Sequence, residues 1–114
     1  DVFITYLDRT GPLTAGFGVN KDKIGPELGF GWVVGDASDA PVLLIKCAWG
    51  GKSLGVDFRS PSSGMPQGLG EKQDAAIKEN PKLVGKYYRE MMDLTKAALK
   101  NVKELVPGSD GRYV

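Results

Sequence analysis

The four residues Gly50, Gly51, Lys52 and Ser53 are the part of this sequence whose types and spacing could do chemistry. Glycine has no side chain to keep a ligand from main-chain N–H groups, and it also adopts the positive φ values that tight turns require. Main-chain N–H groups followed by a lysine and a hydroxyl bind phosphate in phosphate loops, and preorganised N–H groups stabilise the oxyanion in acyl-transfer enzymes. Three interpretations therefore stand at the outset: a phosphate loop, an oxyanion hole and a plain turn.

The spacing of the glycines excludes two nucleotide-binding motifs, the phosphate loop and the dinucleotide-binding loop. A phosphate loop is written G-x-x-x-x-G-K-[ST], and its first glycine would fall at position 46, which is Lys46. The glycines between Gly29 and Gly35 lack the G-x-G-x-x-G spacing of a dinucleotide-binding loop. They also lie inside a predicted helix rather than at a turn from a strand into a helix. No nucleotide cofactor is indicated.

The composition removes several further kinds of site. The chain has 114 residues, a net charge of +1, one cysteine and no histidine. Without histidine, a Ser-His or Cys-His nucleophile cannot be assembled from these residues alone, and zinc lacks the nitrogen and sulfur ligands of its usual sites. The charge gives no basic footprint for nucleic acid, and no apolar run approaches the roughly 20 residues of a membrane helix. We therefore expect no metal, no cofactor, no nucleic acid and no membrane partner.

Two predicted strands must carry the glycine pair. Alternating β-branched and aromatic residues predict a strand from Val2 to Tyr6, followed by a loose hairpin that turns at Gly11-Pro12. The apolar run from Pro41 to Trp49 is typical of a strand covered on both faces in a parallel sheet. Gly50 and Gly51 would then follow the carboxyl end of a parallel strand, where open α/β sheets bind their ligands. Tyr113-Val114 is expected to begin a further strand.

Two helices are predicted around these strands. Pro26 and Glu27 mark the start of one helix, which is expected to end near Gly35. A second, long amphipathic helix is predicted from Pro81 to Leu105, after a long loop over residues 50–70. The order of elements indicates the α/β class. Because the chain opens without methionine and closes on the expected strand, we interpret residues 1–114 as a single partial domain.

The residues around the glycine pair each have an ordinary interpretation as well. Trp49 is expected to anchor a loop or join the core, and Lys52 and Ser53 are expected to be solvated or to cap a turn. Cys47 lies in an apolar strand without a basic neighbour and is expected to be inert. From spacing alone, a turn at Gly51 is the simpler interpretation of the pair.

Three segments together resemble a known family: "GPLTAGFG", "IGPELGFGWVVGD" and "PVLLIKCAWGGKSLGVDFRSPSSG", followed by the long helix. They resemble the sialate O-acetylesterase-like carbohydrate esterases of the SGNH hydrolase superfamily, and the likeness covers nearly the whole chain. The resemblance implies a three-layer αβα, flavodoxin-like sandwich with a parallel core sheet, in a serine hydrolase that removes acetyl esters from sugars. It also implies that Gly50 or Gly51 donates an oxyanion-hole N–H, with Trp49, Lys52 and Ser53 in the pocket wall.

Several motifs of that family have no counterpart in these residues. The family's G-Q-S-N-M-type nucleophile motif, its W-x-Q-G-type strand and its Asp-x-x-His pair are all missing. We therefore expect an internal segment of an acetylesterase domain, inactive alone, that works with the remaining segments of its parent on O-acetylated carbohydrate. Because family members are often exported, the resemblance implies a secreted or periplasmic parent. The alternative is a non-catalytic α/β binding or interaction module, which would explain the missing serine and histidine motifs.

Overall fold

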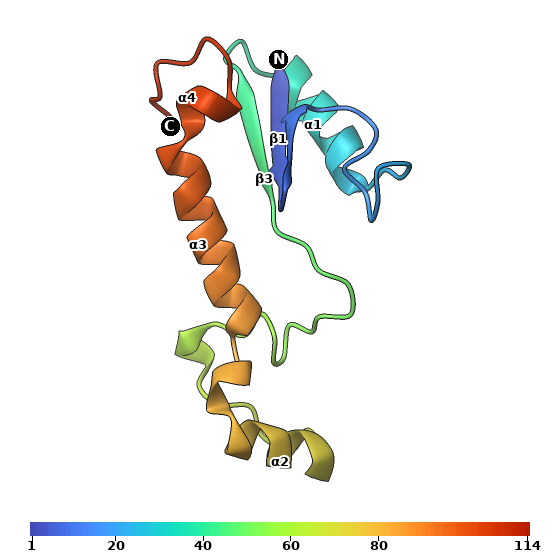
Figure 1. The fold of residues 1–114 in the computed structure, drawn as a ribbon, viewed down its shortest axis with the longest axis vertical. Helices are drawn as coiled ribbons and strands as arrows, with labels where there is room; N and C mark the ends of the chain where they lie inside the picture. The colour runs from blue at the N-terminus through green and yellow to red at the C-terminus, as the bar shows by residue number, and fades with distance from the viewer. The chain divides into compact units, whose positions relative to one another are not determined.

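The computed structural model describes all 114 residues, from Asp1 to Val114. The chain is mixed α/β, which confirms the predicted class (Figure 1). Its elements are β1 (Val2–Tyr6), β2 (Arg9–Pro12), α1 (Pro26–Asp36), β3 (Val42–Lys46), α2 (Glu71–Glu79), α3 (Lys86–Lys100) and α4 (Val102–Leu105), with short 3₁₀ helices η1 (Pro61–Ser63) and η2 (Pro81–Leu83). They form two compact units: a sheet unit, Asp1–Ala48 with Leu94–Val114, and a loop unit, Trp49–Asp93.

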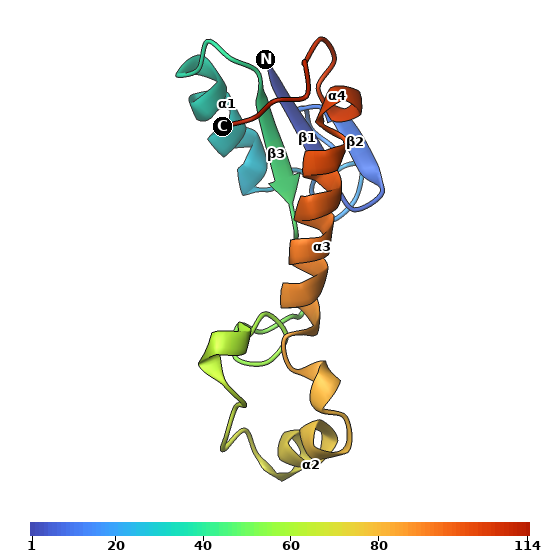
Figure 2. The same cartoon turned by 90° about the vertical axis from the view of Figure 1, so that its left-hand side faces the viewer.

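The sheet has three strands in the order β2-β1-β3 (Figure 2). β1 and β3 are parallel, from Val2 opposite Val42 to Tyr6 opposite Lys46, whereas β1 and β2 are antiparallel. The sheet is therefore mixed, although its β1/β3 pair is parallel as predicted. The hairpin is also present, but the predicted turn at Gly11-Pro12 is wrong, because both residues belong to β2. The chain turns directly after Tyr6, at Leu7, which adopts a φ of 53°.

Close packing of helix α1 explains two of its three internal glycines. A Cβ at Gly31 would lie 2.2 Å from Leu13 Cδ2, and a Cβ at Gly35 would lie 2.4 Å from Val2 Cγ2. These glycines are four residues apart and so share one face of the helix, which allows α1 to approach the sheet closely. Gly29 has no such role, because a Cβ added there would meet open space.

The alternation of side chains along β1 separates two faces of the sheet. Ile4 and Tyr6 belong to the core on the α1 side, which also contains Leu13, Phe17 and Leu28. Thr5 points to the other face and lines a groove of about 210 Å³ with side chains of α3 and α4. β3 was expected to be covered on both faces, but all five of its residues are half-buried, because β3 is an edge strand of the sheet.

The long helix predicted from Pro81 to Leu105 is broken twice. Gly85 separates η2 from α3 with a φ of 69°, a value that a helix cannot contain, and Asn101 separates α3 from α4. Apolar periodicity does not register such breaks, because the residues on either side keep their helical spacing. The strand predicted at Tyr113-Val114 is also absent, and both residues are exposed.

The loop unit contains α2 and a segment with little regular structure. Residues 50–70 include only the short η1 helix, as expected for a long loop, and α2 buries Ile77. None of the chain's helices combines the length and the apolar character that crossing a lipid bilayer requires.

Candidate functional site

Gly50 and Gly51 form a turn four residues after the end of β3. Gly51 has a φ of 69°, so this position requires glycine for its backbone alone. Gly50 does not have a positive φ, and a Cβ at either glycine would meet no atom within 4 Å. Both residues are exposed, and their N–H groups donate no hydrogen bond within the chain. The pair thus presents two free main-chain donors in an open position.

Ser53 caps the turn that follows the glycine pair. Its N–H donates to Asp57 Oδ2 at 2.9 Å, and its hydroxyl lies 3.2 Å from the same oxygen. Ser53 Oγ in turn accepts a hydrogen bond from the N–H of Val56 at 3.1 Å. The hydroxyl is therefore engaged both as donor and as acceptor inside one turn. This arrangement fits the capping role proposed for Ser53 and leaves it without the base that a nucleophilic serine needs.

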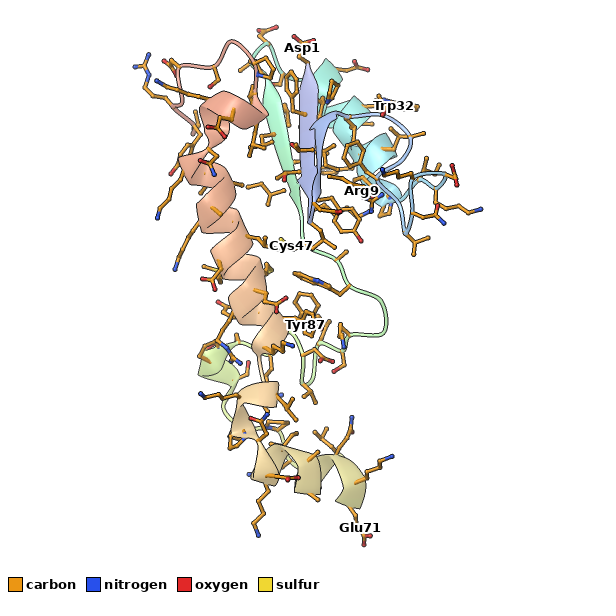
Figure 3. All side chains as sticks on the ribbon, in the orientation of Figure 1. Asp1, Arg9, Trp32, Cys47, Glu71 and Tyr87 are labelled. Atoms are coloured by element: carbon orange, nitrogen blue, oxygen red, sulfur yellow. The ribbon has the colours of Figure 1, made fainter.

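Trp49 belongs to a cluster of three aromatic rings in the loop unit. Its ring centroid lies 5.8 Å from that of Phe58 and 5.0 Å from that of Tyr87, in an edge-on arrangement with Tyr87. The ammonium groups of Lys52 and Lys86 lie over the Tyr87 ring, 4.7 and 5.4 Å from its centroid. Figure 3 shows Tyr87 projecting from α3 toward this loop. The rings and cations hold the segment around the glycine pair in one compact arrangement.

Main-chain hydrogen bonds join the same loop to the start of α3. The N–H groups of Tyr87 and Tyr88 both donate to the carbonyl of Asp57, at 2.9 and 3.3 Å, and the N–H of Gly85 donates to the carbonyl of Val56 at 2.7 Å. These N–H groups precede or begin the helix, where they have no partner within it. The loop therefore acts as the cap of α3, and its own conformation is fixed in return.

Arg59 stabilises the far side of this loop. Its guanidinium donates to the carbonyls of Gly55, Ser63 and Gly64 at 3.3, 2.8 and 2.6 Å. These hydrogen bonds fix the segment from Gly55 to Gly64.

In the sheet unit, a half-buried ion pair joins two of the segments that carry the family resemblance. Lys46 Nζ lies 2.8 Å from Glu27 Oε2, and the two side chains are only 17% and 8% exposed. Lys46 also donates to the carbonyl of Phe17 at 2.5 Å, and Glu27 accepts from the N–H of Gly25 at 3.0 Å. Burial acts to raise the pKa of Glu27, but these hydrogen bonds and the charge of Lys46 outweigh it and lower that pKa.

The thiol of Cys47 lies in the sheet unit, in an environment that keeps it unreactive. Cys47 is half-buried and unpaired. Burial raises the pKa of its thiol, and a hydrogen bond with Thr95 offsets this only in part. Little thiolate is therefore present at neutral pH.

The sequence predicts the glycine pair but does not reveal the residues that order the loop around it. All five predicted site residues, Gly50, Gly51, Trp49, Lys52 and Ser53, lie in the loop unit, and Trp49 and Lys52 meet at the ring of Tyr87. Asp57 could have been found as an acidic residue four positions after Ser53, whereas nothing in the sequence marks Tyr87. No three His, Cys, Asp or Glu residues come together as metal ligands. Comparisons with protein-family models, curated proteins and solved structures found no match.

Proposed function

We propose that these residues form an internal segment of a carbohydrate O-acetylesterase and contribute the glycine turn of its oxyanion hole. The observation that carries the proposal is the pair of free, exposed N–H groups at Gly50 and Gly51, which follow a strand of a parallel pair in the chain. An oxyanion hole needs such donors, already oriented by the surrounding structure, where negative charge develops on the ester carbonyl oxygen.

Three further features support this proposal. The glycine turn is followed by contacts that fix its surroundings, from the Ser53 cap to the ring of Tyr87. The Glu27–Lys46 pair joins the helix-start motif to the strand that precedes the glycines, so two of the resembling segments form one physical unit. The helices that contact the two faces of the β1/β3 pair are also compatible with a three-layer αβα parent fold.

In the proposed reaction, a serine of the parent, activated by a histidine, attacks the acetyl carbonyl of an O-acetylated sugar. The carbonyl oxygen becomes an oxyanion, and the N–H of Gly50 or Gly51 donates a hydrogen bond to it. Neither the nucleophile nor the base lies within these 114 residues, because the chain lacks histidine and Ser53 is engaged in its turn. Trp49 and Lys52 are the side chains nearest in sequence that could border the substrate.

The test is to remove one N–H group at a time from the longer polypeptide that this proposal requires. Replacing Gly50 or Gly51 by glycolic acid turns the amide into an ester and leaves the rest of the turn unchanged. We expect kcat for an acetylated sugar to fall about 10²- to 10³-fold at the donating position. The same replacement at Gly55, an exposed glycine of the next turn, is the matched control and should leave kcat unchanged.

Two results would contradict the proposal. Full activity in both glycolate variants would show that the glycine pair does not form the oxyanion hole. Ester hydrolysis by the isolated 114 residues, abolished by Ser53→Ala, would instead show that the chain carries its own nucleophile.

A further inference from the structure

Tyr6 makes a hydrogen bond that reaches beyond the end of the sheet. Tyr6 is the last residue of β1 and stands opposite Lys46, the last residue of β3. Its hydroxyl donates to the carbonyl of Ala48 at 3.1 Å, two residues past the last paired position. It is the only hydrogen bond made by the main-chain groups from Ala48 to Lys52.

The position of the Tyr6 hydroxyl is fixed by its surroundings. The side chain belongs to the buried core and is only 8% exposed. The ammonium of Lys46 and the guanidinium of Arg9 both lie over its ring, 4.4 and 4.7 Å from the centroid. Lys46 is itself held by Glu27 and by the carbonyl of Phe17. Because these contacts hold the ring in place, its hydroxyl is a fixed donor that restrains the Ala48 carbonyl.

We infer that Tyr6 is a positioning residue for the oxyanion-hole glycines. Its hydroxyl fixes the carbonyl of Ala48 and therefore the plane of the Ala48–Trp49 peptide, which leads directly into Gly50. Without this bond, the main chain from Ala48 to Lys52 makes no hydrogen bond, and the N–H groups of the glycines sample more orientations. This inference rests on the proposed esterase function and adds the group that aligns its donors.

The variant that isolates this contact is Tyr6→Phe in the longer polypeptide. Phenylalanine keeps the buried ring and its contacts with Lys46 and Arg9, and removes only the hydroxyl. We expect kcat for an acetylated sugar to fall about 2- to 10-fold, which corresponds to one hydrogen bond, with KM little changed. Affinity for a boronic acid, which forms a tetrahedral adduct with the serine and places an oxygen in the oxyanion hole, should fall by the same factor. Affinity for the deacetylated sugar should not change.

The control is Tyr113→Phe, because Tyr113 is 61% exposed and its hydroxyl bonds no group of the chain. Tyr6→Phe with unchanged kcat and unchanged boronic acid affinity would overturn the inference while leaving the glycine pair in place. A rise in KM and a loss of sugar affinity as large as the loss in kcat would reduce Tyr6 to a structural residue. An inactive wild-type polypeptide would instead contradict the proposed function, and the inference would fall with it.

Discussion

Eight of the nine buried apolar side chains belong to the sheet unit, and the ninth, Ile77, belongs to the loop unit. The sheet unit packs Ile4, Tyr6 and Leu28 around β1 and adds the shielded pair of Glu27 and Lys46. The loop unit is held instead by main-chain hydrogen bonds, an arginine fork and three half-buried rings. A protein can thus fix a segment without an apolar core, provided that the polar groups of its backbone find partners.

This difference predicts that the two units fail for different reasons. Changes of charge and volume should weaken the sheet unit, whereas changes of backbone conformation should weaken the loop unit. Three sets of substitutions examine this comparison, from the largest expected effect to the smallest.

Lys46→Met should be the most damaging change in the sheet unit. It leaves the Glu27 carboxylate shielded without its partner, and we expect a loss of about 3 to 5 kcal/mol in the free energy of unfolding. Urea unfolding measures this loss. Lys46→Met combined with Glu27→Leu should recover part of it, because no unpaired charge remains. A loss below about 1 kcal/mol in the single variant would show that the pair contributes little.

The same pair predicts a dependence of stability on pH. Because the folded protein lowers the pKa of Glu27 from its usual value of 4.5, the pair contributes stability above that pH. The contribution is lost as the pH falls through the lowered pKa. In Glu27→Gln, urea midpoints measured from pH 7 downward should show less acid destabilisation than in the wild type. Identical acid profiles would argue against a stabilising ionised Glu27.

Gly85→Ala should be the most damaging change in the loop unit. The position has a φ of 69°, and the new Cβ would lie 2.6 Å from the main-chain oxygen of Arg59. We expect a loss of about 2 to 3 kcal/mol, with faster amide exchange at Phe58 and Tyr87. Gly51→Ala is the control, because it shares the φ of 69° but meets open space. It should cost only about 1 kcal/mol. Equal losses would mean that the contact with Arg59 is unimportant.

Gly31→Ala and Gly29→Ala should have the smallest effects on stability, and the two effects should have opposite signs. Alanine favours a helix by about 1 kcal/mol over glycine at either position. At Gly31 the methyl group collides with the ends of Leu13 and Leu44, so we expect a net loss of about 1 kcal/mol. At Gly29 it meets no atom, so we expect a gain of up to about 1 kcal/mol. Thermal unfolding compares the two, and a gain in both would mean that α1 does not need its close approach.

The elements that sequence could predict are those defined by local pattern. The strand Val2–Tyr6, the helix start at Pro26 and the parallel strand before the glycines follow from alternation, helix-start residues and an apolar run. The break at Gly85 does not, because its positive φ accompanies a close contact with Arg59, 26 positions earlier in the chain. Periodicity in one segment carries no information about such a contact.

The candidate site divides in the same way. The glycine pair could be found from its own residue types. The Glu27–Lys46 pair could not, because Glu27 was already explained as a helix-start residue, although a lysine inside an apolar run calls for a buried partner. The roles of Asp57 and Tyr87 depend on how the loop folds back on the start of α3, which no local pattern specifies.

The two tryptophans lie one in each unit, and they differ in environment. Trp32, on the side of α1 away from β1, is 60% exposed, whereas Trp49 is half-buried against the rings of Phe58 and Tyr87 (Figure 3). The protein therefore carries a separate fluorescent reporter for each region. Trp49→Phe leaves emission from the sheet unit alone, readily quenched by acrylamide, and Trp32→Phe leaves a shielded emission from the loop unit. Followed in urea, the two signals reveal whether the apolar core and the hydrogen-bonded loop melt in one cooperative step or in two.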